Sequence, residues 1–140
     1  MVVQGPSGQR TVAAEDFFVG FLETALRPDE MLVEIRVPRL PGARHAYQKF
    51  VKRAQDWAIV GAVATETADD APAVALVNMG MTPIRASAVE SALSAGVSAR
   101  DAAAVADDGT SPMSDLNASE TYRRHLSRVL VERALDAIGR

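Results

Sequence analysis

Apolar and polar residues alternate in several short segments of the chain, and each segment ends at a proline, a glycine or a polar turn. In one segment the two alternating sets are Met31, Val33, Ile35 and Val37 against Leu32, Glu34 and Arg36. This period of two predicts a strand with one buried face. Further strands are predicted over Ala43–Arg53, Ala58–Thr67 and Pro72–Met79. Asp69 and Asp70 suit a turn between the last two, so these three strands should form an antiparallel meander.

The C-terminal part of the chain carries helix signals instead. Three helices are predicted. The first runs from Thr82-Pro83 to Ala95 and is stopped by Gly96, the second is capped by Ser98 and runs through Asp107 until Gly109, and the third is capped by Ser119 or a neighbour and runs to Ile138. The last helix has a mostly apolar rhythm, with Arg123, Arg124, Arg128 and Glu132 expected on its wetter faces. One or two helical turns are also expected at Ala13–Phe18. The predicted fold class is α+β, a three-stranded antiparallel sheet packed against about three helices.

Composition narrows the classes of partner and chemistry. The 140 residues, 48% of them hydrophobic, are enough for one core with an appended arm. The chain has no cysteine, which excludes disulfides, thiolate metal sites and an iron–sulfur cluster within it and fits the cytoplasm. A net charge of −3 without a dense basic stripe argues against nucleic acid as a partner, and no apolar run approaches a membrane span. His45 and His125 lack acidic residues at metal-ligand spacing, so no metal site is expected.

The stretch Ala46–Gly61, AYQKFVKRAQDWAIVG, combines a basic run, a turn with an acid and the only tryptophan. A turn is predicted at Ala54-Gln55-Asp56, between two strands. Lys52, Arg53, Asp56 and Trp57 should therefore lie at a tight corner, where Lys52 and Arg53 can pair with Asp56. Loops on a rigid scaffold are where proteins usually meet ligands, so this corner is the candidate site.

This stretch and four others, taken in order, resemble the C-terminal part of the FAD-binding medium subunit of the molybdenum hydroxylases, the carbon monoxide dehydrogenase and xanthine dehydrogenase group. The other four lie within residues 8–20 (GQRTV, then DFFVG), 26–38 (LRPDEMLVEIRVP), 79–86 (MGMTPIRA) and 119–126 (SETYRRHL). Almost the whole chain is covered. The resemblance implies that residues 1–40 are the last segment of the FAD-binding domain and that residues 41–140 are the C-terminal domain of the carbon monoxide dehydrogenase flavoprotein.

The resemblance also implies which residues lie near the cofactor. Trp57 would shield one face of the isoalloxazine ring, where the family more often has Phe or Tyr, and Lys49 would reach the polar groups of the flavin. Asp56 would be a neighbour of the cofactor, and Leu32 would pack on the flavin. Each residue has a simpler interpretation: Trp57 as a core or interface anchor, Lys49 on a solvated face, Asp56 as a turn residue and Leu32 as ordinary core. No catalytic residue is predicted.

The function implied is that of an oxidoreductase component. The domain would wall the FAD of a subunit that passes electrons from iron–sulfur centres to an external acceptor, and its partners would be the N-terminal FAD-binding half, a molybdenum large subunit and an iron–sulfur small subunit. The chain has no Gly-x-Gly-x-x-Gly and no other glycine cluster for a pyrophosphate, so alone it is not expected to bind FAD or to be active. Phe17, Phe18 and Phe21 would lack their cover and favour a homodimer in isolation. The alternative is a cofactor-free interaction or assembly module that docks with the rest of the subunit.

Overall fold

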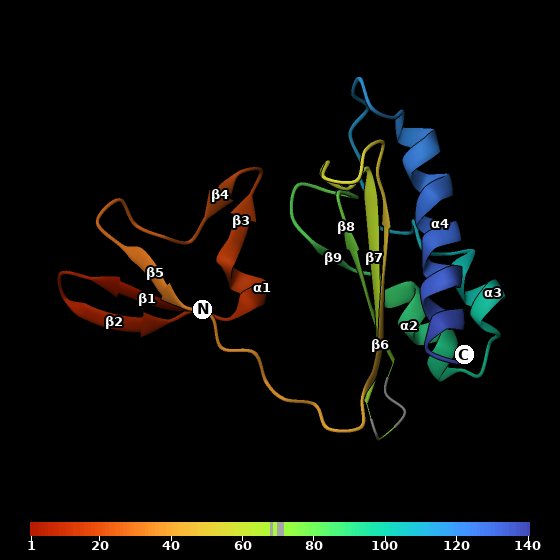
Figure 1. Ribbon diagram of the computed structural model, residues 1–140, viewed down its shortest axis with the longest axis horizontal. Helices are drawn as coiled ribbons and strands as arrows, with labels where there is room; N and C mark the ends of the chain where they lie inside the picture. Colours follow the sequence, from red (N-terminus) through yellow and green to blue (C-terminus); the bar gives the residue numbers. More distant parts are fainter. Residues whose placement is uncertain (68, 70–71) are drawn as a thin grey trace. The chain divides into compact units, whose positions relative to one another are not determined.

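The computed structural model describes residues 1–67, 69 and 72–140, and Asp70 of the predicted turn lies outside this part. The chain divides into two compact units, Met1–Arg39 (unit 1) and Leu40–Arg140 (unit 2), which are described separately. Unit 2 confirms the predicted α+β class: an antiparallel sheet is covered on one face by helices (Figure 1).

Unit 1 is built mainly from short strands. Its elements are β1 (Val2–Gly5), β2 (Gly8–Thr11), α1 (Ala14–Phe17), β3 (Phe18–Gly20), β4 (Glu23–Thr24) and β5 (Met31–Glu34). Strand β1 lies between β2 and β5 and is antiparallel to both, while β3 pairs with β4. The β1–β2 hairpin was not predicted from the sequence. The expected helical segment at 13–18 is a single turn, because Phe18 already continues as strand β3.

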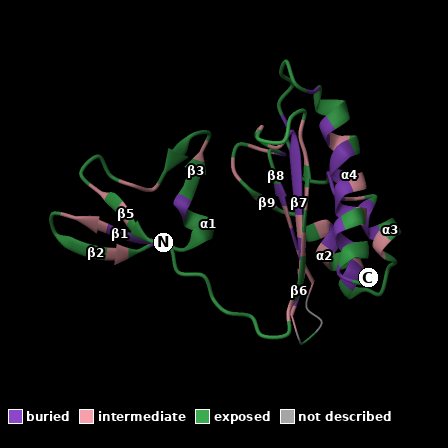
Figure 2. Ribbon diagram, in the orientation of Figure 1, coloured by how far each residue is buried: buried purple, intermediate pink, exposed green. Residues whose placement is uncertain are grey.

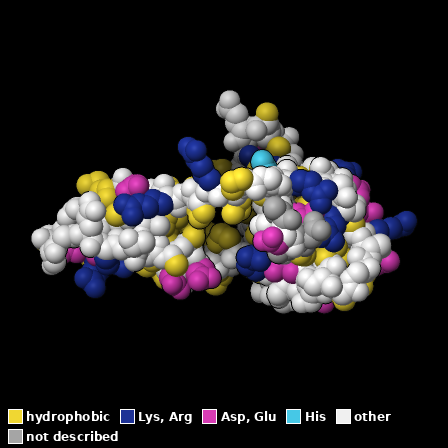
Figure 3. Space-filling model, turned by 90° about the horizontal axis from the view of Figure 1, so that it is seen from below, with side chains coloured by type: hydrophobic (Ala, Val, Ile, Leu, Met, Phe, Trp, Pro, Cys, Tyr) yellow, Lys and Arg dark blue, Asp and Glu magenta, His cyan; other side chains and the backbone are white. Residues whose placement is uncertain are grey.

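The burial pattern of unit 1 differs from two sequence predictions. Val3, Val12 and Phe17 are buried, and Leu32 packs against them half-buried. Phe17 therefore has its own cover, whereas Phe18 and Phe21 are exposed. The predicted buried face of Met31–Val37 was wrong, since all four of its apolar residues (Met31, Val33, Ile35 and Val37) are exposed. The unit is too small to cover both faces of this strand. Its residues are mostly exposed or half-buried (Figure 2), and hydrophobic side chains reach its surface (Figure 3).

An ion pair joins the hairpin of unit 1 to the segment before β5. The Arg10 guanidinium donates to both carboxylate oxygens of Glu30, at 2.8 and 2.7 Å, and to the Ala25 carbonyl at 2.7 Å. Glu30 also accepts the backbone N–H of Arg27 at 2.8 Å. Because the Glu30 side chain is only 5% exposed, this two-pronged contact adds a charge-assisted link between the hairpin and the segment before β5.

The sheet of unit 2 is a meander in the order β6 (Arg44–Phe50), β7 (Val60–Glu66), β8 (Pro72–Val77) and β9 (Ile84–Arg85). The antiparallel register confirms the predicted pairing of the first three strands. Inner residues alternate with outer ones. The rows that face the helices are Phe50–Val60, Gln48–Ala62–Leu76 and Ala46–Ala64–Val74, and most of their members are buried.

The helices α2 (Ser87–Ser94), α3 (Ala99–Ala103) and α4 (Glu120–Ala137) cover this inner face (Figure 1). The predicted caps are confirmed: Ser98 accepts the Asp101 N–H and Ser119 accepts the Tyr122 N–H, both at 3.2 Å. Gly96, just after α2, has a φ of +80°, which suits a glycine that ends a helix, whereas Gly109, with a φ of +72°, lies at the end of the turns that follow α3. Helix α3 ends well before the predicted Asp107.

Helix α2 begins at Ser87, not at Thr82-Pro83 as predicted, because Ile84 and Arg85 pair with Leu76 and Ala75 of β8. Ile84 packs against the core, and its Cδ1 would lie 2.6 Å from a Cβ added at Gly80. A larger residue at position 80 would therefore push this short strand away. No helix in the described part of the chain is long and apolar enough to cross a membrane.

We predict that unit 1 loses stability in acid because the Arg10–Glu30 ion pair is lost there. Hydrogen bonds from Arg10 and Arg27 lower the pKa of Glu30 from 4.5 to about 2. A folded-state pKa below the unfolded value means that the ion pair stabilises the unit above about pH 4.5, and this contribution disappears as the pH falls toward 2. Glu30→Gln should destabilise unit 1 at neutral pH. It should also remove most of the loss of stability between about pH 4.5 and 2, as measured by NMR during an acid titration.

The control for this titration is Glu15→Gln, a change of an exposed acid on α1. It should leave the acid transition of unit 1 unchanged. An unaltered transition in Glu30→Gln would contradict the prediction.

We also predict that the isolated chain self-associates through the apolar face of β5 and the residues after it. Apolar surface costs about 25 cal/mol per Å² to leave in water. Ile35, which is 61% exposed, would place a charge in the contact if changed to Lys. Ile35→Lys should lower the association measured by light scattering, whereas Ser7→Lys at the hairpin tip should not. A strictly monomeric unmodified chain at high concentration would refute this prediction.

Candidate functional site

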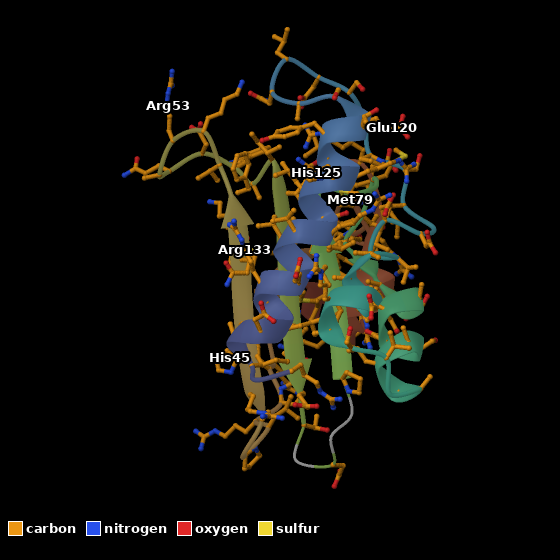
Figure 4. The ribbon with its side chains drawn as sticks, turned by 90° about the vertical axis from the view of Figure 1, so that its right-hand side faces the viewer. His45, Arg53, Met79, Glu120, His125 and Arg133 are labelled. Atoms are coloured by element: carbon orange, nitrogen blue, oxygen red, sulfur yellow. The ribbon has the colours of Figure 1, made fainter. Side chains whose placement is uncertain are left out.

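The corner between β6 and β7 is an ordered turn. The Asp56 N–H donates to the Arg53 carbonyl at 3.0 Å, which confirms the predicted turn at 54–56. The Ile59 N–H then donates to the Phe50 carbonyl at 2.8 Å and closes the loop. Asp56 is half-buried within this turn, while Arg53 extends away from it (Figure 4). The corner is thus a defined projection at one end of the sheet.

Trp57 is 86% exposed at this corner. A packed aromatic side chain buries about 150–250 Å², worth about 4 to 6 kcal/mol at 25 cal/mol per Å². That stabilisation is not gained in this chain, so the interpretation of Trp57 as an internal core residue is wrong. A large apolar side chain held outward on an ordered turn is instead suited to a ligand or to another protein segment.

Lys49 lies near the end of β6 on the outer face of the sheet, opposite the helices. In the register it belongs to the row Lys49–Gly61–Val77, and its side chain is exposed. Gly61 is buried although it is on the outer face, because the ring of Tyr47 lies over it. A Cβ at position 61 would stand 3.2 Å from the Tyr47 hydroxyl. Tyr47 and Gly61, which the sequence analysis did not select, thus form a flat platform beside Lys49.

Lys52 contacts a loop and not Asp56, the acid predicted to pair with it. Its ammonium group lies 3.3 Å from both the Leu116 carbonyl and the Asn117 Oδ1, in the loop that precedes α4. This loop and the corner therefore lie together. Leu116 itself is 100% exposed, which adds a second outward apolar side chain at this end of the domain.

A buried arginine connects the same two segments. Arg123 of α4 is 2% exposed, against the prediction that it lies on a wet face. It donates to the Ile59 carbonyl at 2.5 Å and to the Asp115 carboxylate at 2.7 Å. Backbone N–H groups of Ala118 and Asn117, together with Arg123, lower the pKa of Asp115 to about 2. For Arg123, the sequence offered one signal, its position in the SETYRRHL string.

The four residues predicted to contact a cofactor fall into two groups. Lys49, Asp56 and Trp57 belong to unit 2, at or near one end of its sheet. Leu32 belongs to unit 1, where it packs against the small core. His45 lies on β6 and His125 on α4 (Figure 4). Among the described residues, no group of three or more His, Cys, Asp or Glu side chains could hold a metal ion.

Unit 2 is thus a two-layer α+β domain that presents an aromatic side chain and a cation at one corner of its sheet. The family model of the CO dehydrogenase flavoprotein C-terminal domain matches residues 45–138. The chain belongs to this family.

Individual proteins agree with this assignment. The carbon monoxide dehydrogenase medium chain of Hydrogenophaga pseudoflava is 34% identical over 145 residues, which cover 97% of this chain and 50% of the relative. The 6-hydroxypseudooxynicotine dehydrogenase complex subunit alpha of Paenarthrobacter nicotinovorans is 30% identical, with 96% and 49% covered. The chain therefore spans about half the length of the curated relatives it matches.

Solved structures share the fold. A structure of the Hydrogenophaga pseudoflava carbon monoxide dehydrogenase matches with a TM-score of 0.86 and 34% identity, covering 98% of this chain and 51% of that one. Quinoline 2-oxidoreductase from Pseudomonas putida 86 gives the same TM-score of 0.86 at 27% identity, covering 99% and 51%.

We predict that Trp57→Ala changes the stability of the chain little. Exposed substitutions usually shift the free energy of unfolding by about 0.5 kcal/mol or less, so the melting temperature should stay within a few degrees. The comparison is Leu76→Ala, a fully buried side chain, which should lose about 2–5 kcal/mol. Thermal and urea unfolding measure both variants. A loss in Trp57→Ala close to that of Leu76→Ala would show that Trp57 is scaffold.

Proposed function

We propose that this chain is the C-terminal part of the FAD-binding medium subunit of a molybdenum hydroxylase, in which its corner walls one side of the flavin. The observation that carries the proposal is Trp57, which is 86% exposed on a turn held by hydrogen bonds on both sides. Family membership supports the class of subunit. The Trp57 environment supports the particular role, because an outward indole on a fixed backbone is arranged to stack on a planar ring.

The residues at the corner fit an isoalloxazine ring and not a whole FAD molecule. The ring is planar and apolar with a polar edge, and it would meet an aromatic side chain and a cation here. The pyrophosphate of FAD needs clustered backbone N–H groups, usually from a glycine-rich loop, and the nine glycines of this chain form no such motif. The phosphate-binding residues would therefore lie in the half of the subunit that this chain does not span.

Each residue would have a separate task. Trp57 would cover one face of the ring by offset stacking, worth about 0.5–1.5 kcal/mol beyond area burial, and exclude water from that face. Lys49 would hold a positive charge near the polar edge, and Asp56 would keep the turn closed beside it. The bound FAD would supply the redox chemistry, the passage of electrons from iron–sulfur centres to an external acceptor.

The partners proposed are those that the resemblance implies: an N-terminal FAD-binding half, a molybdenum large subunit and an iron–sulfur small subunit. The names of the relatives, which include medium chains and subunits of dehydrogenases, support an assembly of this kind. The absence of cysteine agrees with iron–sulfur centres carried by another polypeptide and with a cytoplasmic location. A cofactor-free docking module is the competing function, and the exposed apolar face of unit 1 would serve it equally well.

The test combines the purified 140-residue chain with the half of the Hydrogenophaga pseudoflava medium chain that this chain does not match. We expect the chain alone to be colourless and the combined subunit to retain flavin absorbance through gel filtration. In the combined subunit, Lys49→Gln should lower the flavin reduction potential by about 20–50 mV, because a cation near the ring favours the added negative charge.

The matched control is Lys52→Gln, since the Lys52 ammonium is directed to Leu116 and Asn117. It should shift the potential much less. A combined subunit that assembles without flavin, or a flavin reduction potential that is unchanged in Lys49→Gln, would favour the docking module. Flavin retained by the 140-residue chain alone would contradict the assignment of the phosphate site to the other half.

A further inference from the structure

A buried charged side chain, Arg123, contacts the corner that presents Trp57. Arg123 projects from the first turns of α4, and only 2% of its surface is exposed. Burying a guanidinium is costly unless its donors are matched, and two of them are: one meets the Ile59 carbonyl, the other the Asp115 carboxylate. Ile59 is two residues after Trp57. The charged group therefore acts directly on the backbone that carries the exposed indole.

A second side chain also holds this backbone. The Asn78 amide donates to the Ala58 carbonyl at 2.9 Å and to the Ile59 carbonyl at 3.2 Å. Asn78 follows β8 and has a φ of +62°, a conformation that asparagine adopts more readily than most residues. The Ile59 carbonyl thus accepts from Asn78 and from Arg123, while the Ile59 N–H donates to Phe50. The N–H and the carbonyl of Ile59 are therefore both held by hydrogen bonds.

The Asp115 end of the contact is fixed as well. Its Oδ1 accepts the N–H groups of Asn117 and Ala118 at 2.8 and 2.9 Å, so the carboxylate is already held by its own loop when Arg123 meets the other oxygen. The same loop accepts the ammonium of Lys52 from the corner. Arg123 is therefore the central link between helix α4, the loop before it and the turn.

We propose that Arg123 is a positioning residue: by joining the Ile59 carbonyl to the Asp115 carboxylate it holds the 52–59 segment in the conformation that presents Trp57. The significance of this for a flavin rests on the proposed function. The contact itself does not, because it can be tested in the chain without cofactor. Lysine cannot replace the arginine, since one ammonium on a flexible stem does not supply two donors in a fixed fork.

The experiment is amide hydrogen exchange by NMR on the 140-residue chain, comparing Arg123→Lys with the unmodified protein. The reporting amide is Ile59, whose N–H is bonded to Phe50. Loss of a charge-assisted hydrogen bond should raise its exchange rate by about tenfold or more, while the amide of Ala62 in the centre of the sheet stays protected. Fluorescence anisotropy of Trp57, the only tryptophan, should fall in the same variant as the turn becomes mobile.

The matched control is Arg124→Lys, the next residue of the same helix. Its guanidinium donates to the Thr110 and Asp107 carbonyls, at 3.0 and 3.1 Å, and within the described part of the chain it forms no hydrogen bond or ion pair with the corner. This variant should raise the exchange of the Thr110 amide and leave that of Ile59 and the Trp57 anisotropy unchanged. If Arg123→Lys does not fold, Asp115→Asn replaces it, because that half-exposed side chain can lose its charge without leaving a cavity.

Two results would overturn the inference: an Ile59 amide that exchanges as before, or equal acceleration of Ile59 and Ala62, which would make Arg123 a general stabiliser of the core. The outcome for the proposed function is separate. Trp57 could become mobile in Arg123→Lys while the flavin of the combined subunit is unchanged by Trp57→Ala. That result would support the positioning role of Arg123 and contradict the proposal that Trp57 walls the flavin. An immobile Trp57 would remove the positioning role even if the flavin responds to Trp57.

Discussion

The packing of α4 against the inner face of β7 is the constraint on which unit 2 depends. The contact is close because the two central inner residues of β7 are Ala62 and Ala64, both fully buried, so the helix can approach the strand backbone. On the helix side Leu126, Leu130 and Ala134 fill the space. Removing a large side chain from such a layer costs about 2–5 kcal/mol, which is a large share of the stability of a small domain. The position of everything at the ends of α4 follows from this layer.

Buried charges tie α4 to the sheet at both ends. At its beginning Arg123 meets the Ile59 carbonyl just before β7. After its end, Arg140 and Arg44 both pair with Glu66, the last residue of β7, which is 1% exposed. The helix therefore runs in the same direction as β7. Buried ion pairs add little net stability but are costly to mismatch, so these contacts select one register of helix on sheet.

At the corner, the backbone is held in place while the Trp57 side chain is exposed. The backbone around Trp57 is held by contacts from Asn78 and Arg123, whereas the indole itself is left in solvent. A binding residue held in this way loses little further backbone entropy when it meets its partner, and preorganisation of this kind improves affinity. Lys49 and the platform of Tyr47 over Gly61 extend the same surface along the outer face of the sheet.

The local sequence by itself determined much of the fold. Alternation, caps and turn residues act over a few positions, so the β6–β7–β8 meander, the Ser98 and Ser119 caps and the turn at 54–56 could all be predicted. The corner could be predicted in the same way, because its basic run, acid and tryptophan are contiguous. Local sequence does not determine which residues of the corner remain exposed.

Tertiary structure decided the features that depend on distant neighbours. Alternation shows that Met31–Val37 has two faces, but the side of β5 on which Val3 and Phe17 lie decides that Leu32 is covered and Ile35 is not. Residues Ile84 and Arg85 became a strand because β8 offered an open edge. Arg123 looks like any helix-surface arginine until the Ile59 carbonyl and Asp115 are brought to it from positions 64 and 8 residues away. Charge patterns along a helix report solvent exposure on average, whereas burial of a single guanidinium is set by partners that only the fold assembles.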